Sequence, residues 1–270
     1  MKYFKTFETF ISNTTVGNGT EIDYQEGPNL KLLMGVSSRK LKIGVYYDYG
    51  VKTETVNIWD NFFSKYFNQN PQLLDTKTIN YKRIKNLDLL VIPGGKAFRE
   101  SLGLGEENKA DIKRWVEEGG KLLAVCAGAH LVSSGHSWSM NLVPITHIER
   151  QEDLSQDIMQ LYFSITEKGS EVFKTSAKSV RLYFHGGPIF NPSKDKESEI
   201  EVLMNFDGEV PHTEDGIEDF TDGRIAAVIS KYGKGEILTI SPHIEKTASM
   251  DELLSDGINY LMEKKNLTVF

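Results

Sequence analysis

The chain has 270 residues, 39% of them hydrophobic and 26% charged, and this composition fits a globular protein with one large α/β domain or two small ones. Its net charge of −7, with Lys and Arg scattered along the chain, disfavours nucleic acid and anionic membranes as partners. No apolar run is long enough to span a membrane, no secretory signal is recognisable, and a lone cysteine cannot form an internal disulfide, so we expect a cytoplasmic protein.

A regular alternation of strands and helices begins after an N-terminal extension, which we assign to residues 1–40. Continuous apolar runs predict strands at residues 41–47, 71–76, 87–92 and 121–125. Amphipathic patterns between them predict helices over residues 58–67 and 107–120. Gly119 is the expected stop signal of the second helix. Apolar strands alternating with helices indicate an α/β fold with a mostly parallel sheet covered on both faces, in a single domain of residues 41–270.

The second half of the chain is less regular. Residues 132–180 suggest loops and meandering strands, and the acidic stretch 207–223 suggests a solvated loop. The remaining patterns predict strands at residues 179–184 and 200–206, a β-hairpin at 224–240 and a closing helix at 251–262.

The single cysteine, Cys126, stands where the strand "KLLAV" should end and a helix should begin. Small residues follow it (Ala127, Gly128 and Ala129), as the tight turn of a nucleophile elbow requires. A helix N-terminus stabilises a thiolate, and the Ala127 amide would point toward an oxyanion formed at Cys126. Alternatively, Cys126 is a small apolar side chain that fills the core.

A cysteine nucleophile needs a base and an acceptor that orients the base. In "SPHIE", His243 and Glu245 are two residues apart just beyond a strand, so in an extended segment they would face the same way. The same triplet occurs earlier as His147 and Glu149, but that copy is not clearly at a sheet edge. Position therefore favours His243, although either histidine could be an ordinary surface residue beside a glutamate.

Gly94 and Gly95 end the strand at 87–92, which should neighbour the strand that leads to Cys126. Glycine permits positive φ and a close approach of a backbone N–H to a bound carbonyl, so a second oxyanion donor is expected here, with a plain turn as the alternative. "GHSWS" resembles a serine hydrolase signature but lacks its last glycine and a preceding strand, which disfavours Ser137 as a nucleophile. No metal-binding or phosphate-loop pattern is found, so the sequence indicates no metal and no cofactor.

Four segments in this order resemble the class I glutamine amidotransferase-like superfamily: "LLVIPGGKAF", "VEEGGKLLAVCAGAHL", "YFHGGPIF" and "GKGEILTISPHIE". Within it, the chain is most similar to the domain found at the N-terminus of some biotin–protein ligases. The resemblance implies a flavodoxin-like three-layer fold with Cys126, His243 and Glu245 as a triad. It also implies that residues 185–188 line the pocket, with His185 either touching substrate or incidental beside the fold glycines Gly186 and Gly187.

Two departures bear on function. Glutaminases of this superfamily have the pattern C-x-G-x-Q at the elbow, and the last position of this pattern is His130 here. Two residues before the cysteine, Ala124 stands where many relatives have glycine. Glutaminase activity is therefore not expected, and no biotin-ligase G-R-G-R segment is present.

Three functional hypotheses remain. The first is a cysteine hydrolase or amidase for a small-molecule amide or carbonyl substrate, with His130 in the substrate pocket. The second is a non-catalytic binding or regulatory module that keeps the fold. The third is a relative of the PfpI-type peptidases and deglycases, for which Asp48 is the only obvious acidic partner of the cysteine. The sequence does not indicate an oligomeric state.

Overall fold

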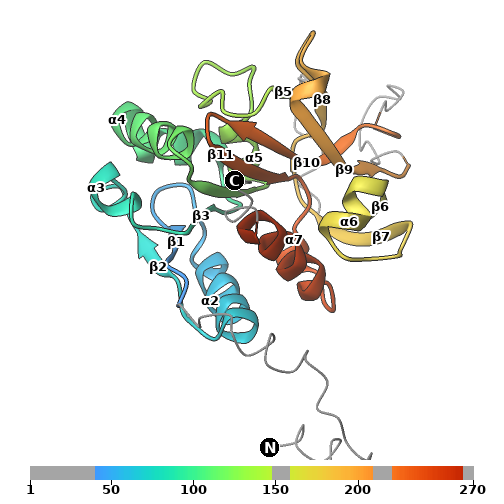
Figure 1. The fold of residues 1–270 in the computed structure, drawn as a ribbon, viewed down its shortest axis with the longest axis horizontal. Coiled ribbons are helices and arrows are strands. Elements are labelled where there is room, and N and C mark those ends of the chain that lie inside the picture. Colours follow the sequence, from blue (N-terminus) through green and yellow to red (C-terminus); the bar gives the residue numbers. More distant parts are fainter. Residues whose placement is uncertain (1–39, 148–158, 209–220, 264–270) are drawn as a thin grey trace, which may run out of the picture. The chain divides into compact units, whose positions relative to one another are not determined.

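The computed structural model describes residues 40–147, 159–208 and 221–263 (Figure 1). The predicted N-terminal extension lies outside these residues except for Lys40, and so does most of the acidic stretch 207–223. Within the described ranges, no helix is both long enough and apolar enough to cross a membrane.

The first half of the chain forms a parallel sheet, as its apolar runs predict. The strand order is β2-β1-β3-β4-β11, and each neighbouring pair is parallel. The bounds are β1 Ile43–Tyr46, β2 Gln72–Leu74, β3 Leu89–Ile92, β4 Lys121–Val125 and β11 Gly235–Ile240. The strands β1, β3, β4 and β11 are buried along their whole length, which explains why they are mostly apolar and do not alternate with polar residues.

Helices cover both faces of this parallel half, giving three layers (Figure 1). Alternate residues of one strand enter two separate cores; on β3, for example, Leu89 packs with α2 and α7, and Leu90 packs with α3, α4 and α5. The bounds are α2 Thr53–Phe67, α3 Tyr81–Ile84, α4 Ala97–Glu117, α5 Ala127–Val132 and α7 Asp251–Glu263. This arrangement confirms the predicted α/β class.

Helix α4 starts ten residues before the predicted helix of 107–120, because two helical segments run end to end across a kink at Gly105. Gly105 has φ of 67° and ψ of 171°, which is outside helical geometry. The predicted stop signal is confirmed: Gly119 has φ of 120°, and its N–H donates to the Val116 carbonyl over 2.9 Å.

The second half of the sheet is antiparallel, so the prediction of a mostly parallel sheet is wrong there. The predicted hairpin of β10 (Ile225–Tyr232) and β11 is present, and its turn at Gly233 reverses the chain. Three further strands continue the sheet from β10: β9 Ile200–Phe206, β6 Met159–Ile165 and β7 Ser179–Phe184. Two short strands, β5 Ile145–His147 and β8 Phe190–Pro192, pair at one margin. Six of the ten pairings between the described strands are antiparallel.

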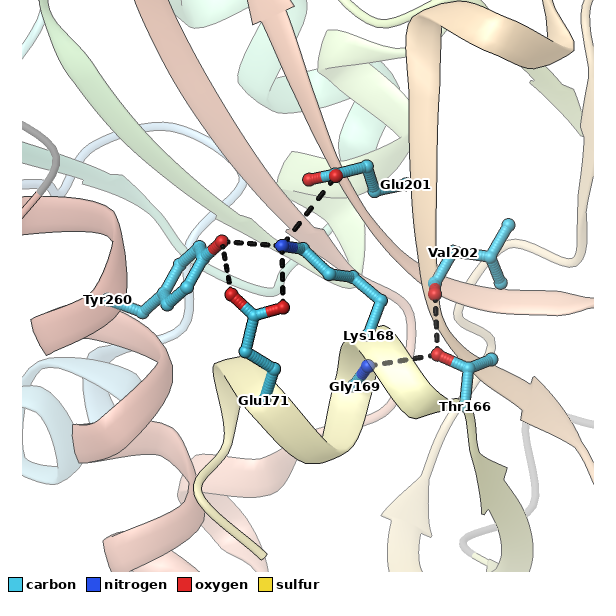
Figure 2. A network of polar contacts seen from close by, with 7 residues as sticks. All are labelled: Thr166, Lys168, Gly169, Glu171, Glu201, Val202 and Tyr260. Atoms are coloured by element: carbon cyan, nitrogen blue, oxygen red, sulfur yellow. Dashed lines mark hydrogen bonds and ion pairs between the residues drawn. The ribbon is translucent and has the colours of Figure 1, made fainter.

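A polar network fastens the short helix α6 (Glu167–Val172) to its neighbours (Figure 2). Thr166 caps the helix, accepting a hydrogen bond from the Gly169 N–H, and its hydroxyl donates to the Val202 carbonyl on β9. Lys168 Nζ lies 2.7 Å from the Tyr260 hydroxyl on α7 and 3.6 Å from Glu201 on β9. The network joins α6 to helix α7 and to strand β9 of the sheet.

Candidate active site

Cys126 lies at the junction of β4 and α5, at the carboxyl ends of the parallel strands. Its φ of 52° and ψ of −106° are sterically costly for a residue with a side chain. The backbone is held in this turn because the Cys126 N–H donates to the Ile240 carbonyl of β11 over 2.9 Å. The residue is 5% exposed. The predicted elbow geometry is therefore present, with a buried sulfur.

The small residues after Cys126 are explained by close packing against the end of β3. A Cβ added to Gly128 would lie 2.2 Å from the Ile92 carbonyl oxygen, so a larger residue cannot fit. The Gly128 N–H donates to the Pro93 carbonyl over 3.1 Å. Ala127 is the first residue of α5, so its N–H has no acceptor inside the helix and is available to a ligand at the turn.

His243 and Glu245 form a buried pair directly after β11. His243 Nδ1 lies 2.6 Å from Glu245 Oε1, with the two side chains 3% and 0% exposed. The expected pairing is present, but the backbone is not the extended segment that was predicted, because Glu245 belongs to a 3-10 turn, Ile244–Lys246. The His243 N–H donates to the Tyr183 carbonyl of β7, and Thr247 Oγ1 donates to the His243 carbonyl over 2.8 Å. These bonds fix the imidazole relative to the sheet.

The pKa of His243 depends on both Glu245 and Cys126. Burial acts to lower the pKa of His243, but the negative charges of a Cys126 thiolate and of Glu245, with hydrogen bonds to both side chains, raise that pKa to about 10. Because Nδ1 is engaged by Glu245, Nε2 is the ring nitrogen left for the Cys126 sulfur. The raised pKa of His243 favours a protonated imidazole beside Cys126.

Gly94 and Gly95 lie at the same rim, for a different reason from the one expected. Neither has positive φ. A Cβ on Gly94 would lie 2.4 Å from His243 Cε1 and 3.2 Å from Cys126 Cβ, and one on Gly95 would lie 2.3 Å from a carboxylate oxygen of Glu100. Both positions thus require glycine because of space rather than backbone conformation.

Glu100 on α4 is an acidic neighbour of Cys126 that the sequence did not reveal. It is fully buried, and neither carboxylate oxygen has a hydrogen-bond partner among the described residues. Burial, with a smaller contribution from a negative Cys126, raises the pKa of Glu100 well above its ordinary value. Asp48, the acidic candidate from the sequence, instead accepts hydrogen bonds from the Thr76 and Tyr49 backbone N–H groups.

The segment 185–188 contacts the cysteine through its backbone. The Cys126 thiol donates to the His185 carbonyl, with Sγ and oxygen 3.6 Å apart. The His185 side chain is half-buried, and burial followed by the charges of Lys52 and His243 lowers its pKa. Gly186 has φ of 62°, and a Cβ on Gly187 would lie 2.4 Å from the Ser241 carbonyl oxygen. Both glycines therefore have a role in the backbone fold of this segment.

His130 is half-buried in the last turn of α5 and lies with two other histidines. Its ring centroid is 5.3 Å from that of His147, which in turn is 3.9 Å from that of His136. Burial, with smaller contributions from His147 and His136, lowers the pKa of His130 to about 3. His147 therefore belongs to this cluster of three histidines, and its expected partner Glu149 lies outside the described residues. Ser137 is exposed in the intervening loop.

Comparison with solved structures shows the fold in other proteins. A glutamine amidotransferase matches with a TM-score of 0.54 at 17% identity, over 82% of this chain and 97% of its own. A ThuA-like protein from Bacteroides uniformis matches with a TM-score of 0.57 at 12% identity, over 90% and 95%. A GMP synthase-type protein from Thermoplasma acidophilum matches with a TM-score of 0.56 at 10% identity, over 83% and 96%.

No curated protein sequence matches this chain significantly. The family model described as "Biotin-protein ligase, N terminal" matches residues 42–155 and 158–267, which is most of the chain. Together with the amidotransferase-like neighbours, this match supports the resemblance seen in the sequence motifs. The chain belongs to the biotin–protein ligase N-terminal family and has an amidotransferase-like fold.

Proposed function

We propose that this protein is a cysteine-dependent hydrolase or amidase that acts on a small amide or carbonyl compound. The observation that carries the proposal is the combination of Cys126 at positive φ with a buried His243 whose Nδ1 is 2.6 Å from Glu245. Strain at a strand-to-helix turn and an oriented imidazole are features of nucleophilic cysteine sites. Neither is needed for a cysteine that merely fills a core.

In the proposed reaction, the Cys126 thiolate attacks the substrate carbonyl carbon and the carbonyl π electrons move to oxygen. The tetrahedral intermediate collapses, the C–N bond breaks, and the His243 imidazolium gives its proton to the leaving amine. A water molecule then attacks the thioester and transfers a proton to His243, which releases a carboxylic acid and restores the thiolate. Glu245 holds the Nδ1 proton of His243 throughout.

The oxyanion of both tetrahedral intermediates would be bound by backbone N–H groups of Ala127 and Gly95. Ala127 begins a helix, and Gly94, which precedes Gly95, packs closely against His243 and Cys126. Loss of one such donor typically costs about 2.7–4 kcal/mol of transition-state stabilisation. Burial raises the pKa of Glu100, which adjoins Gly95, so its carboxyl is ionised less readily than an ordinary one and would add less negative charge where the oxyanion would form.

The substrate is proposed to be other than glutamine, since His130 occupies the position that is glutamine in the glutaminase pattern C-x-G-x-Q. His130, His185, Gly186 and Gly187 would form the wall of the substrate pocket opposite Gly94. A wall built from two imidazoles and glycine backbone suits a small polar amide or ester.

The test is labelling of the protein with a panel of amide- and ester-derived carbonyl electrophiles, followed by intact-mass spectrometry. We expect one adduct per chain, none in Cys126→Ala, and labelling slowed about 10²–10³-fold in His243→Ala, because the base contributes on the order of this factor. Ser137→Ala is the matched control, an exposed residue outside the site, and should label like the wild type. Labelling of His243→Ala at the wild-type rate would contradict the proposal.

The second candidate function, a non-catalytic binding module, is favoured by the burial of Cys126 and by its contact with the His185 carbonyl. In that case no member of the panel would label Cys126 under native conditions. A small ligand found by thermal-shift screening would then bind wild type and Cys126→Ala equally well.

A further inference from the structure

We propose that His130, His136 and His147 form a binding site for a divalent transition metal ion, for which Zn²⁺ is the best fit. One ring nitrogen from each histidine lies within 4.8 Å of the others. This is the only such group of metal-ligating side chains found in the part of the chain that the structure describes. The site contains neither of the proposed reacting side chains, Cys126 and His243, although it shares His130 with the proposed substrate pocket.

The three histidines come from separate but well-anchored segments. His130 is on α5, His147 ends β5 opposite Phe190 of β8, and His136 lies in the loop between them. The loop is fixed to β5 because the Ser134 N–H donates to the Ile145 carbonyl over 2.7 Å.

A second set of contacts anchors His136. Its ring stacks on Trp138 with centroids 4.4 Å apart. The Trp138 carbonyl in turn accepts hydrogen bonds from Ser101 Oγ at 2.8 Å and from the buried Lys109 Nζ at 3.2 Å, both on α4. The loop that carries His136 is therefore held on a helix rather than free in solvent, as a pre-organised ligand requires.

The Gly186 backbone lies near the His130 ring and acts to raise its pKa, against the larger effect of burial. Donation of one ring N–H to this backbone would leave the other nitrogen of His130 as a lone-pair donor with a fixed direction, as is usual for metal-bound histidines.

The geometry fits zinc with a modest adjustment. Two nitrogens bound to one tetrahedral Zn²⁺ at about 2.0–2.1 Å lie about 3.4 Å apart. Side-chain rotations that move each ring nitrogen by about 1 Å would bring the three nitrogens to this spacing. Three imidazoles suit Zn²⁺ better than Mg²⁺ or Ca²⁺, which prefer oxygen ligands. All three residues are half-buried, so a fourth position would remain open to water or to a ligand.

The experiment measures zinc binding by tag-free protein that has been stripped with a chelator, using calorimetry and metal analysis after gel filtration. The wild type should bind one Zn²⁺ per chain. His136→Ala and His147→Ala should each bind it at least about 10²-fold more weakly, since each removes a direct ligand. Excess Zn²⁺ should raise the melting temperature of the wild type and not of these variants.

Two controls separate this site from the other candidate metal ligands. Cys126→Ser and His185→Gln remove a thiol and an imidazole outside the cluster and should keep the wild-type zinc affinity. Melting curves without zinc report whether His136→Ala and His147→Ala are folded. The proposal is overturned if the wild type binds no zinc, if a folded His136→Ala or His147→Ala keeps wild-type affinity, or if either control loses the metal.

Discussion

Strands β4 and β11 have buried ionisable side chains at both ends, and the two ends are built in opposite ways. At the amino end, Lys121 Nζ lies 2.6 Å from Glu236 Oε2, both side chains are almost fully buried, and the two residues are direct partners in the parallel register. At the carboxyl end, Cys126 and His243 lie just beyond the last residues of the strands, next to Glu245.

The amino end has regular strand backbone and a direct opposite-charge pair. The carboxyl end has Cys126 at a φ of 52°, and Glu245 Oε2 and both Glu100 oxygens lack hydrogen-bond partners among the described residues. Strain and unsatisfied polar atoms are thus concentrated at one end of a shared pair of strands. Concentration of this kind is expected of a functional site and not of a stabilising one.

The largest effect on stability is expected at the amino end. Lys121→Met removes the cation that lies 2.6 Å from the buried Glu236 carboxylate, and removal of one partner of a buried pair costs about 3–5 kcal/mol. Urea unfolding at neutral pH measures this loss. The double variant Lys121→Met/Glu236→Leu should recover most of it, because no buried charge remains. A loss of under about 1 kcal/mol in the single variant would remove the contrast between the two ends.

At the carboxyl end, Gly94→Ala should slow a reaction instead. The new Cβ would overlap His243 Cε1 and displace the imidazole, and misplacement of a reacting group by about 1 Å can cost about 10²-fold in rate. The measurement is the rate of Cys126 alkylation by iodoacetamide at neutral pH. Gly44→Ala is the matched control: its Cβ would lie 2.7 Å from Leu87 Cδ1 in the core, so it should lower stability and leave the alkylation rate unchanged.

The third prediction concerns the pH dependence of stability at Glu100. Its pKa is raised in the folded protein, so the unfolded chain loses this proton first, above its ordinary pKa of about 4.3. Stability should therefore fall as pH rises from there toward the folded pKa, by about 1.4 kcal/mol for each pH unit. Glu100→Gln should flatten this slope in urea unfolding measured at a series of pH values from about 5 upward. Glu107→Gln, exposed on the same helix, should not change it.

The smallest effect on stability is expected away from the ends of β4 and β11, in the polar network around α6 (Figure 2). Lys168 and its partners Glu171 and Glu201 are partly or largely exposed, so solvent screens these charges. Lys168→Met should lower the free energy of unfolding by about 1 kcal/mol or less, and less still at high salt. An effect comparable with that of Lys121→Met would mean that burial does not decide the strength of these ion pairs.

The parallel half of the fold was predictable because four of its five strands are buried along their whole length and are mostly apolar. In the antiparallel half, the sequence predicted the positions of β7, β9 and the β10–β11 hairpin, but not the bounds of β5, β6 and β8 or the direction in which the strands run. Its strands β6 and β7 are separated by the six-residue helix α6, and β5 and β8 have three residues each, too short for a periodic pattern. The direction of β9 and β6 follows from pairing onto the β10–β11 hairpin, which is a tertiary event.

The same distinction applies to the site. Cys126, Gly94 and His243 each follow a recognisable strand, so their order along the chain predicted their meeting at one sheet edge. Glu100 has no local signature, because its significance comes only from burial beside Gly95. His130, His136 and His147 come together through irregular loops and a three-residue strand, and their spacing matches no metal-binding motif.

The pairing of β4 with β11 also has a consequence for how the protein folds. Lys121 and Glu236 are 115 residues apart in the chain, so this contact closes a very long loop. Contacts of such sequence separation form slowly, and the chain is synthesised from its N-terminus. During synthesis, Cys126 emerges long before His243, and the thiol meets this histidine only when the final hairpin docks. Reactivity of the cysteine would therefore report completion of the fold.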